Sequence, residues 1–126
     1  MSAFLWVGLG GFLGSVARYA VAMWCGAAQP GRFPWATFAV NCAGCLLIGV
    51  LAGLFSRASV PGTVRLFLIT GVLGGFTTFS AFGLESVVLL RRGETGLALL
   101  YVLGSVMVGV LAVCLGLRLA APGAGR

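Results

Sequence analysis

Apolar residues fall along this chain in four long runs, separated by short segments that carry most of the charges. Residues 33–56 and 96–117 contain no charged side chain, residues 1–28 contain only Arg18, and residues 66–84 again contain none. Runs of about 20 apolar residues are long enough to cross a bilayer as helices. The pattern predicts an all-α integral membrane protein. The expected helices cover residues 3–28, 33–56, 66–90 and 96–119.

Composition supports one membrane domain over residues 1–126. The chain is 60% hydrophobic and only 8% charged, whereas soluble proteins carry about 25% charged residues. No histidine is present, and we recognise no nucleophile paired with a base. An enzyme is therefore not expected, and the four runs leave no length for a soluble catalytic domain.

A secretory signal peptide is the competing interpretation of the first run, because Ala20, Val21 and Ala22 resemble a cleavage site. However, no Lys or Arg precedes this run, and it is long for the apolar part of a signal peptide. We therefore interpret it as an integral helix.

The net charge of +6 arises from eight arginines and two acidic residues, without a lysine. The arginines lie near the ends of the runs and form no basic face, so nucleic acid is not an expected partner. Cytoplasmic loops normally carry an excess of Lys and Arg, which fixes orientation. Here the bias is nearly absent, and the chain could insert both ways up, as an antiparallel homodimer requires. We expect four arginines on one side of the membrane and three on the other. The first set is Arg57, Arg65, Arg118 and Arg126, and the second is Arg32, Arg91 and Arg92.

The middle of the third run is predicted to interrupt its helix. Gly74 and Gly75 add backbone freedom, and the nearby hydroxyls of Thr77, Thr78 and Ser80 can bond the chain in non-helical ways. Unpaired backbone at membrane depth is tolerated only inside protein or beside water. The break therefore indicates an ion site, and carbonyls at the end of a half-helix suit a cation. The alternative is a simple kink.

Aromatic residues follow the expected break at a regular spacing. Phe76, Phe79 and Phe82 recur every three residues and should share one face of the resumed helix. The alternative is that they are ordinary packing residues. Ring edges carry positive quadrupole charge, so Phe79 and Phe82 turned edge-on could line a narrow path for a small anion.

Few other side chains within the runs can donate a hydrogen bond. Tyr101 and Ser105 share one face of the last helix with Gly109. Asn41 could join helices, which is the common role of an intramembrane Asn, or donate to an anion. Arg18 could line an aqueous vestibule and attract anions, or lie at the interface beside aromatic anchors. Together with Thr78 and Ser80, these side chains are the candidate anion donors.

Two cysteines form a CxxC pattern, Cys42 to Cys45. The pattern stands in an apolar helix, with no histidine and no βαβ context. We interpret these cysteines as small packing residues, and expect neither a disulfide nor a metal site.

Three stretches resemble the CrcB/Fluc family of fluoride channels and together extend over nearly the whole chain. The first is the segment GGFTTFSAF at residues 74–82, followed by Glu85. The second is the opening glycine-rich segment GGFLGSVARY at residues 10–19, and the third is PWATFAVNCAG at residues 34–44, with Asn41 at the asparagine of the motif.

The resemblance implies a passive fluoride-export channel in the bacterial inner membrane. It implies an antiparallel dual-topology homodimer with two pores, each of which draws on both chains. A structural sodium ion would be held at the dimer interface by the Gly74 and Thr77 carbonyls. The pore lining implied by the family is Asn41, Phe79, Phe82, Tyr101 and Ser105.

This chain departs from the family pattern at three positions. Gly109 stands where relatives commonly have a second serine. Cys45 occupies a position that is often Ser or Gly, and Ala81 one that is often Thr. One pore hydroxyl is thus expected to be absent or replaced by water.

Two other functions stay open at this point. A small dual-topology proton-coupled multidrug antiporter also has four helices, but it needs an intramembrane carboxylate, typically in the first helix. Glu85, near the end of the third helix, is the sole candidate here. A non-transporting helical subunit is the third possibility.

Overall fold

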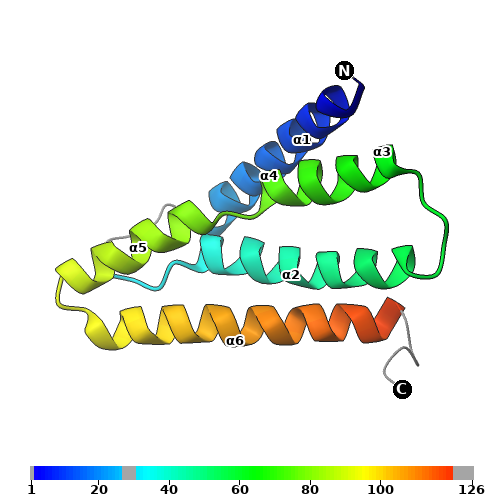
Figure 1. The fold of residues 1–126 in the computed structure, drawn as a ribbon. Coiled ribbons are helices and arrows are strands. Elements are labelled where there is room, and N and C mark those ends of the chain that lie inside the picture. Colours follow the sequence, from blue (N-terminus) through cyan, green and yellow to red (C-terminus); the bar gives the residue numbers. More distant parts are fainter. Residues whose placement is uncertain (1, 27–30, 121–126) are drawn as a thin grey trace.

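The structure is a computed structural model, which describes residues 2–26 and 31–120 of the chain. Within these ranges every regular element is a helix (Figure 1). The elements are α1 (Ser2–Cys25), α2 (Trp35–Phe55), α3 (Gly62–Arg65), the π-helix η1 (Leu66–Leu73), α4 (Gly74–Phe76), α5 (Phe79–Arg91) and α6 (Thr95–Ala120).

The four predicted spans are confirmed by helices that are long and apolar enough to cross a membrane. The third span, Gly62–Arg91, begins four residues earlier than expected. Helix α1 ends at Cys25, and residues 27 and 28, where the sequence pattern predicted its end, lie outside the described residues. The other boundaries differ from the prediction by one or two residues.

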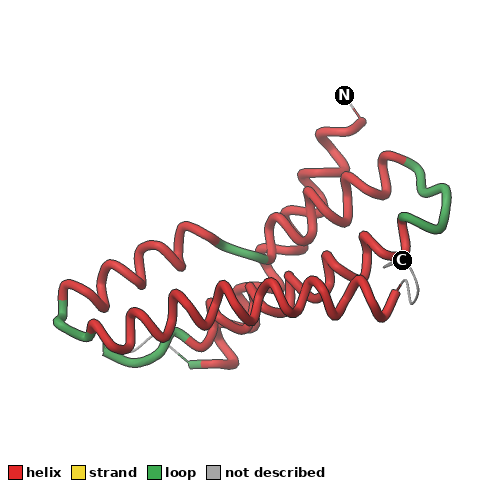
Figure 2. Tube along the Cα trace, turned by 60° about the horizontal axis from the view of Figure 1, so that its bottom comes forward, coloured by secondary structure: helices red, strands yellow, loops and turns green. Residues whose placement is uncertain are grey.

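The spans alternate in direction and form two side-by-side pairs (Figure 1). Helix α2 runs along α6 in the same direction, and α1 runs along η1 and α4. Figure 2 shows the non-helical connection between α4 and α5 in the middle of the third span. That connection therefore lies at the centre of the molecule.

Glycines bring the backbones of each pair into contact. A Cβ at Gly10 would lie 2.9 Å from the Gly71 Cα, and one at Gly14 would collide with the Val72 carbonyl. In the other pair, a Cβ at Gly116 would lie 2.7 Å from the Val50 nitrogen. Gly10 and Gly14 stand four residues apart on one face of α1, the spacing of closely packed membrane helices. Such contacts let helices associate where lipid removes the hydrophobic driving force.

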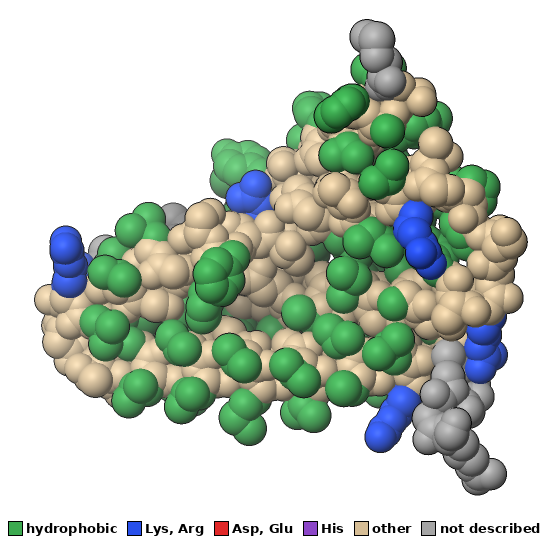
Figure 3. All heavy atoms as spheres, viewed as in Figure 1, with side chains coloured by type: hydrophobic (Ala, Val, Ile, Leu, Met, Phe, Trp, Pro, Cys, Tyr) green, Lys and Arg blue, Asp and Glu red, His purple; other side chains and the backbone are tan. Residues whose placement is uncertain are grey.

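Apolar side chains cover the outside of the molecule. Figure 3 shows them along the outward face of α6, with arginine side chains towards the two ends of the molecule. Leu103, Met107 and Leu111 are each more than half exposed. An apolar surface of this length is what a lipid bilayer covers.

Candidate functional site

The third span is interrupted at Thr77 and Thr78, which are both extended. The Asn41 side chain of α2 binds this segment twice. Its Oδ1 accepts a hydrogen bond from the Thr78 N–H at 2.8 Å, and its Nδ2 donates to the Thr78 carbonyl at 3.0 Å. The amide therefore replaces the helical partners that Thr78 lacks, which makes the break tolerable at membrane depth.

Threonine hydroxyls finish the helix ends on each side of the break. Thr77 Oγ1 donates to the Leu73 carbonyl at 2.9 Å. Thr78 Oγ1 accepts from the Ala81 N–H at 3.3 Å, as an N-cap side chain does. The Ser80 hydroxyl lies 3.4 Å from that of Thr78. Two of the predicted donors, Thr78 and Ser80, thus lie together at the start of α5.

The hydrogen bonds at the break also leave two backbone carbonyls without helical N–H partners. In a continuous α-helix, the Thr78 N–H would donate to Gly74 and the Ala81 N–H to Thr77. Both N–H groups are engaged elsewhere, by Asn41 and by the Thr78 hydroxyl. The Gly74 and Thr77 carbonyls therefore lose their usual partners. They are the two carbonyls that the resemblance assigns to a cation.

Arg18 of α1 also reaches the break. Its Nε donates to the Gly75 carbonyl at 3.0 Å, and its side chain is half-buried. The guanidinium thus binds the end of the α4 helix, where cations are favoured by the helix dipole. This contact joins α1 to the interruption, and it is a contact that neither expected position of Arg18 included.

The two glycines do not form the break, contrary to the expectation from their backbone freedom. Gly74 is helical, with φ −62° and ψ −37°. A Cβ at Gly75 would collide with the Gly11 carbonyl, so Gly75 serves helix contact. The break lies at the threonines because Asn41 can bond the backbone there. Phe76 consequently precedes the break and is not on the resumed helix with Phe79 and Phe82.

A groove of about 400 Å³ lies beside the break. Its walls come from α2, the third span and α6, and none of its lining side chains is charged. Its polar members are neutral groups, several of which can donate hydrogen bonds. The lining is Asn41, Gly44, Cys45, Ile48, Ile69, Leu73, Gly74, Thr77, Thr78, Phe79, Phe82, Ser105 and Val106.

Ser105 has a hydroxyl without a partner. Its Oγ is buried, yet it makes no hydrogen bond to any group within residues 2–26 and 31–120. Buried polar groups are nearly always paired, and leaving one unpaired costs about 1–3 kcal/mol. A hydroxyl beside the groove with its proton unused can donate to an anion there.

Aromatic rings connect the groove to the interior. The Phe79 and Phe82 rings lie 5.6 Å apart, and the Phe82 and Tyr101 rings 5.2 Å apart. Phe79 is 83% exposed in the single chain, whereas Tyr101 is fully buried. The row continues to Phe33, whose ring meets that of Tyr101 edge-on at 5.3 Å.

Glu85 joins three helices through its carboxylate. The Thr37 hydroxyl donates to Oε1 at 2.8 Å, and the Tyr101 hydroxyl donates to Oε2 at 2.7 Å. The hydroxyl of Tyr101, a predicted anion donor, is therefore engaged with Glu85. Sequence reasoning missed Thr37 and left the role of Glu85 open. The available signal was the spacing of Thr37 and Asn41, which places both on one face of α2.

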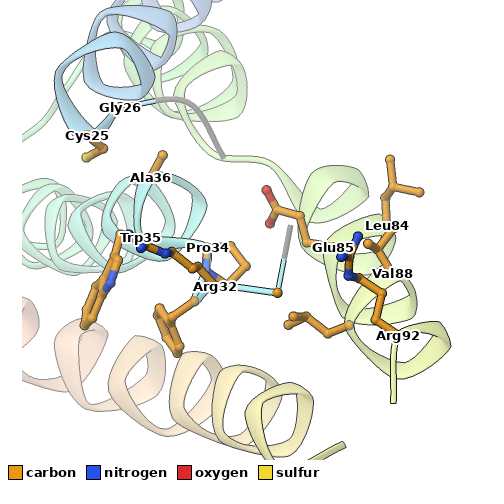
Figure 4. Close-up of a pocket in the computed structure, with 13 residues that line it drawn as sticks. Cys25, Gly26, Arg32, Pro34, Trp35, Ala36, Leu84, Glu85, Val88 and Arg92 are labelled. Atoms are coloured by element: carbon orange, nitrogen blue, oxygen red, sulfur yellow. The ribbon is translucent and has the colours of Figure 1, made fainter. Parts of the chain in front are cut away.

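A second hollow of about 410 Å³ lies on the other side of Glu85, between the ends of α1, α2 and α5 (Figure 4). Arg32 and Arg92 both line it, together with Glu85. Its walls are otherwise mostly apolar, with Trp35 on α2 and Leu84 on α5 among them. Phe33 lines this hollow as well, so the hollow borders both Glu85 and the end of the aromatic row.

The four cysteines are free thiols in the structure. Cys42 and Cys45 lie three residues apart on α2, and of the two only Cys45 lines the groove. Within residues 2–26 and 31–120, no cluster of His, Cys, Asp and Glu side chains could hold a metal ion.

The fold and site define a class of protein: a multi-pass helical membrane protein with a broken third span and an uncharged groove beside the break. Residues 5–117 match the family described as CrcB-like protein, Camphor Resistance (CrcB). The chain belongs to this family, as its motifs indicated, and it is a multi-pass protein of the bacterial inner membrane.

Several relatives are similar over almost their full lengths. A protein of Novosphingobium aromaticivorans named fluoride-specific ion channel FluC is 50% identical over 94% of this chain and 96% of its own. A FluC of Paracoccus denitrificans is 53% identical over 90% of each chain. A FluC of Thermus thermophilus is 47% identical over 92% of this chain and 91% of its own.

Proposed function

We propose that this protein is a fluoride-selective channel that lets cytoplasmic fluoride leave the cell passively. The observation that carries the proposal is the groove beside the broken span, which offers neutral donors and aromatic rings and no charged side chain. Fluoride only accepts hydrogen bonds, so neutral donors suit it. The names of the relatives, which are fluoride-specific channels, support the same ion.

The proposed pathway follows the aromatic row and the hydroxyls next to it. Phe79 and Phe82 would present ring edges, which carry positive charge, and Ser105 would donate from its unpartnered hydroxyl. Asn41 keeps one Nδ2 hydrogen beyond its bond to the Thr78 carbonyl, because an amide has two. Narrow width and few donors would favour a small anion over chloride.

The remaining predicted pathway residues lie at the edges of this route. Thr78 and Ser80 are at the start of α5, where their hydroxyls meet. Tyr101 is oriented by Glu85 and supports the Phe82 ring. Arg18 supplies positive charge beside the break. In this proposal Arg18 attracts anions towards the break, and the donors within the groove replace the water molecules that hydrate the anion.

A structural sodium ion fits the carbonyls that the break releases. Gly74 and Thr77 would hold it through their carbonyl oxygens, which lack their helical N–H partners. Carbonyl oxygen is a ligand that hard cations prefer. When bound, the ion would supply positive charge to these oxygens and so stabilise the interrupted backbone.

The proposed assembly is an antiparallel homodimer. Four thin helices can hardly enclose a pore alone, and the groove and Phe79 are open in the single chain. A second copy in the opposite orientation would cover them and bring the two breaks together. The arginines allow this, since they are divided almost equally between the two sides.

The antiporter alternative is not supported. A proton carrier in the first helix would need a carboxylate there, and α1 has none. Glu85 accepts two hydrogen bonds from Thr37 and Tyr101, which is the arrangement of a structural carboxylate. The relatives are named ion channels, so we do not propose an enzymatic activity. A non-transporting subunit would leave the unpartnered Ser105 hydroxyl unexplained.

Fluoride efflux from liposomes tests the proposal, with wild type compared to Phe82→Ile. Loss of the ring edge should slow fluoride release about tenfold, which corresponds to about 1.4 kcal/mol. Phe67→Ile is the matched control, because Phe67 packs on Trp6 away from the groove. Unchanged efflux in Phe82→Ile would remove that ring from the pathway, and no efflux from wild type would overturn the function.

A further inference from the structure

Cys45 stands on the groove wall one helical turn beyond Asn41. Both residues belong to the face of α2 that lines the groove, and Ile48 follows on the same face. Cys45 is therefore the last polar group of α2 before this wall becomes wholly apolar.

Gly109 stands opposite, one turn beyond Ser105 on α6. It is buried, and a Cβ at this position would lie 3.3 Å from Cys45 Sγ. This spacing is tighter than most real Cβ contacts, so a side chain at 109 and the thiol at 45 compete for one space. In this chain the thiol fills it.

A thiol differs from a hydroxyl in that space. Its sulfur is larger and more polarizable, and its S–H is a weak donor. It lies in the groove one turn beyond Asn41 on α2 and next to Gly109, which is one turn beyond Ser105 on α6. A bulky weak donor at that level narrows the groove without adding charge.

We propose that Cys45 and Gly109 together form a selectivity-determining level of the anion route, at which the thiol sets the width. The inference rests on the proposed channel function. It predicts that enlarging the Cys45 side chain closes the route, and that removing the thiol lets larger anions through.

Thiol modification tests the first prediction. The variant C25A/C42A/C114A keeps only Cys45, and the matched control C25A/C45A/C114A keeps only Cys42 on the same helix. The probe is methyl methanethiosulfonate. The Cys thiol loses its proton to water, and the resulting thiolate attacks the sulfenyl sulfur of the reagent. The new S–S bond forms as the S–SO₂ bond breaks, and methanesulfinate leaves. The reagent itself is the oxidant, and a methylthio group stays on the cysteine.

Each variant is compared with itself before treatment. The reagent should cause about a tenfold loss of fluoride efflux in the Cys45-only variant and no loss in the Cys42-only variant. Mass spectrometry measures the modification. A Cys45-only variant that is modified and conducts as before overturns the inference, and so does a Cys45 that the reagent cannot reach. An unmodified parent that releases no fluoride overturns the proposed function itself, and this inference with it.

Moving the larger side chain from position 45 to position 109 tests whether the two positions share one space. Gly109→Ser alone should reduce fluoride efflux, because its side chain meets the thiol. Cys45→Ala alone should raise chloride release relative to fluoride. The double variant Cys45→Ala/Gly109→Ser should return toward wild type in both measurements, since one side chain again occupies the space. Strictly additive effects of the two substitutions would contradict the proposal.

Discussion

Asn41 and Thr78 are joined by two hydrogen bonds, so a side-chain amide pairs with a backbone amide as a neighbouring strand would. The distances are 2.8 Å to the Thr78 N–H and 3.0 Å to its carbonyl. Because Asn41 takes the Thr78 N–H, the Gly74 carbonyl is left for another partner. One side chain thus both supports the interruption and creates the opening for an ion.

Replacement of Asn41 should destabilise the protein. Asn41→Ala removes both bonds and leaves two backbone groups of Thr78 without a partner, at a cost of about 2 kcal/mol or more. Thermal unfolding in detergent, followed by the fraction of monodisperse protein, measures the effect. Cys42→Ala on the same helix is the control and should unfold close to wild type. Equal stability of Asn41→Ala and wild type would show that other groups support the break.

Close contact between α1 and the third span should depend on Gly14. Gly14→Ala places a Cβ against the Val72 carbonyl, and overpacking of this kind costs about 1–3 kcal/mol. Gly8→Ala is a matched control on the same helix, because nothing lies within 4 Å of its Cβ. The yield of folded protein and its melting temperature should fall for Gly14→Ala only. If both variants behave alike, the two helices do not pack as described.

The Thr37 and Tyr101 hydrogen bonds to Glu85 should make coupled contributions to stability, because both end on the same carboxylate. Tyr101→Phe and Thr37→Val each remove one donor, and each should cost on the order of 1 kcal/mol. The double variant should lose more than the sum, because the carboxylate is then left without either partner. A double-mutant cycle of melting temperatures gives the coupling. Simple additivity would mean that water or another group already satisfies Glu85.

Sodium should stabilise the protein if it binds the released carbonyls. An ion that binds only the folded state raises its stability by about 2.7 kcal/mol at 100 times its Kd. The melting temperature in sodium chloride should therefore exceed that in choline chloride at the same ionic strength. Asn41→Ala frees the Thr78 N–H to bond the Gly74 carbonyl again, so this variant should lose the difference. Identical melting in both salts would contradict the proposed ion.

The helices were predictable because bilayer thickness demands long apolar runs, and such runs are visible in the sequence. The location of the break was only partly predictable. Thr77 and Thr78 were expected to bond in non-helical ways, but Gly74 and Gly75, which were expected to share in the break, lie in helices. The deciding factor is the pairing of Thr78 with Asn41, 37 residues earlier. Local sequence does not show such a contact.

Other parts of the site were beyond sequence reasoning for similar reasons. The π-helix Leu66–Leu73 has no local signal in its apolar residues. The partners of Glu85 come from α2 and α6, so its role could only be seen once those helices were placed. Asn41, Phe79, Phe82 and Ser105 were all named from the sequence, and the structure brings them together around one groove.

The most direct test of the channel uses liposomes loaded with equal potassium fluoride and potassium chloride, with wild-type protein incorporated. Valinomycin lets potassium leave with the anions so that charge is balanced, and the release of both halides is recorded. Fluoride should leave down its gradient, while chloride stays inside as in protein-free liposomes. An imposed proton gradient should not change the rate of protein-dependent release. Release of both halides together, or of neither, would contradict a fluoride-selective route beside the Thr77–Thr78 break.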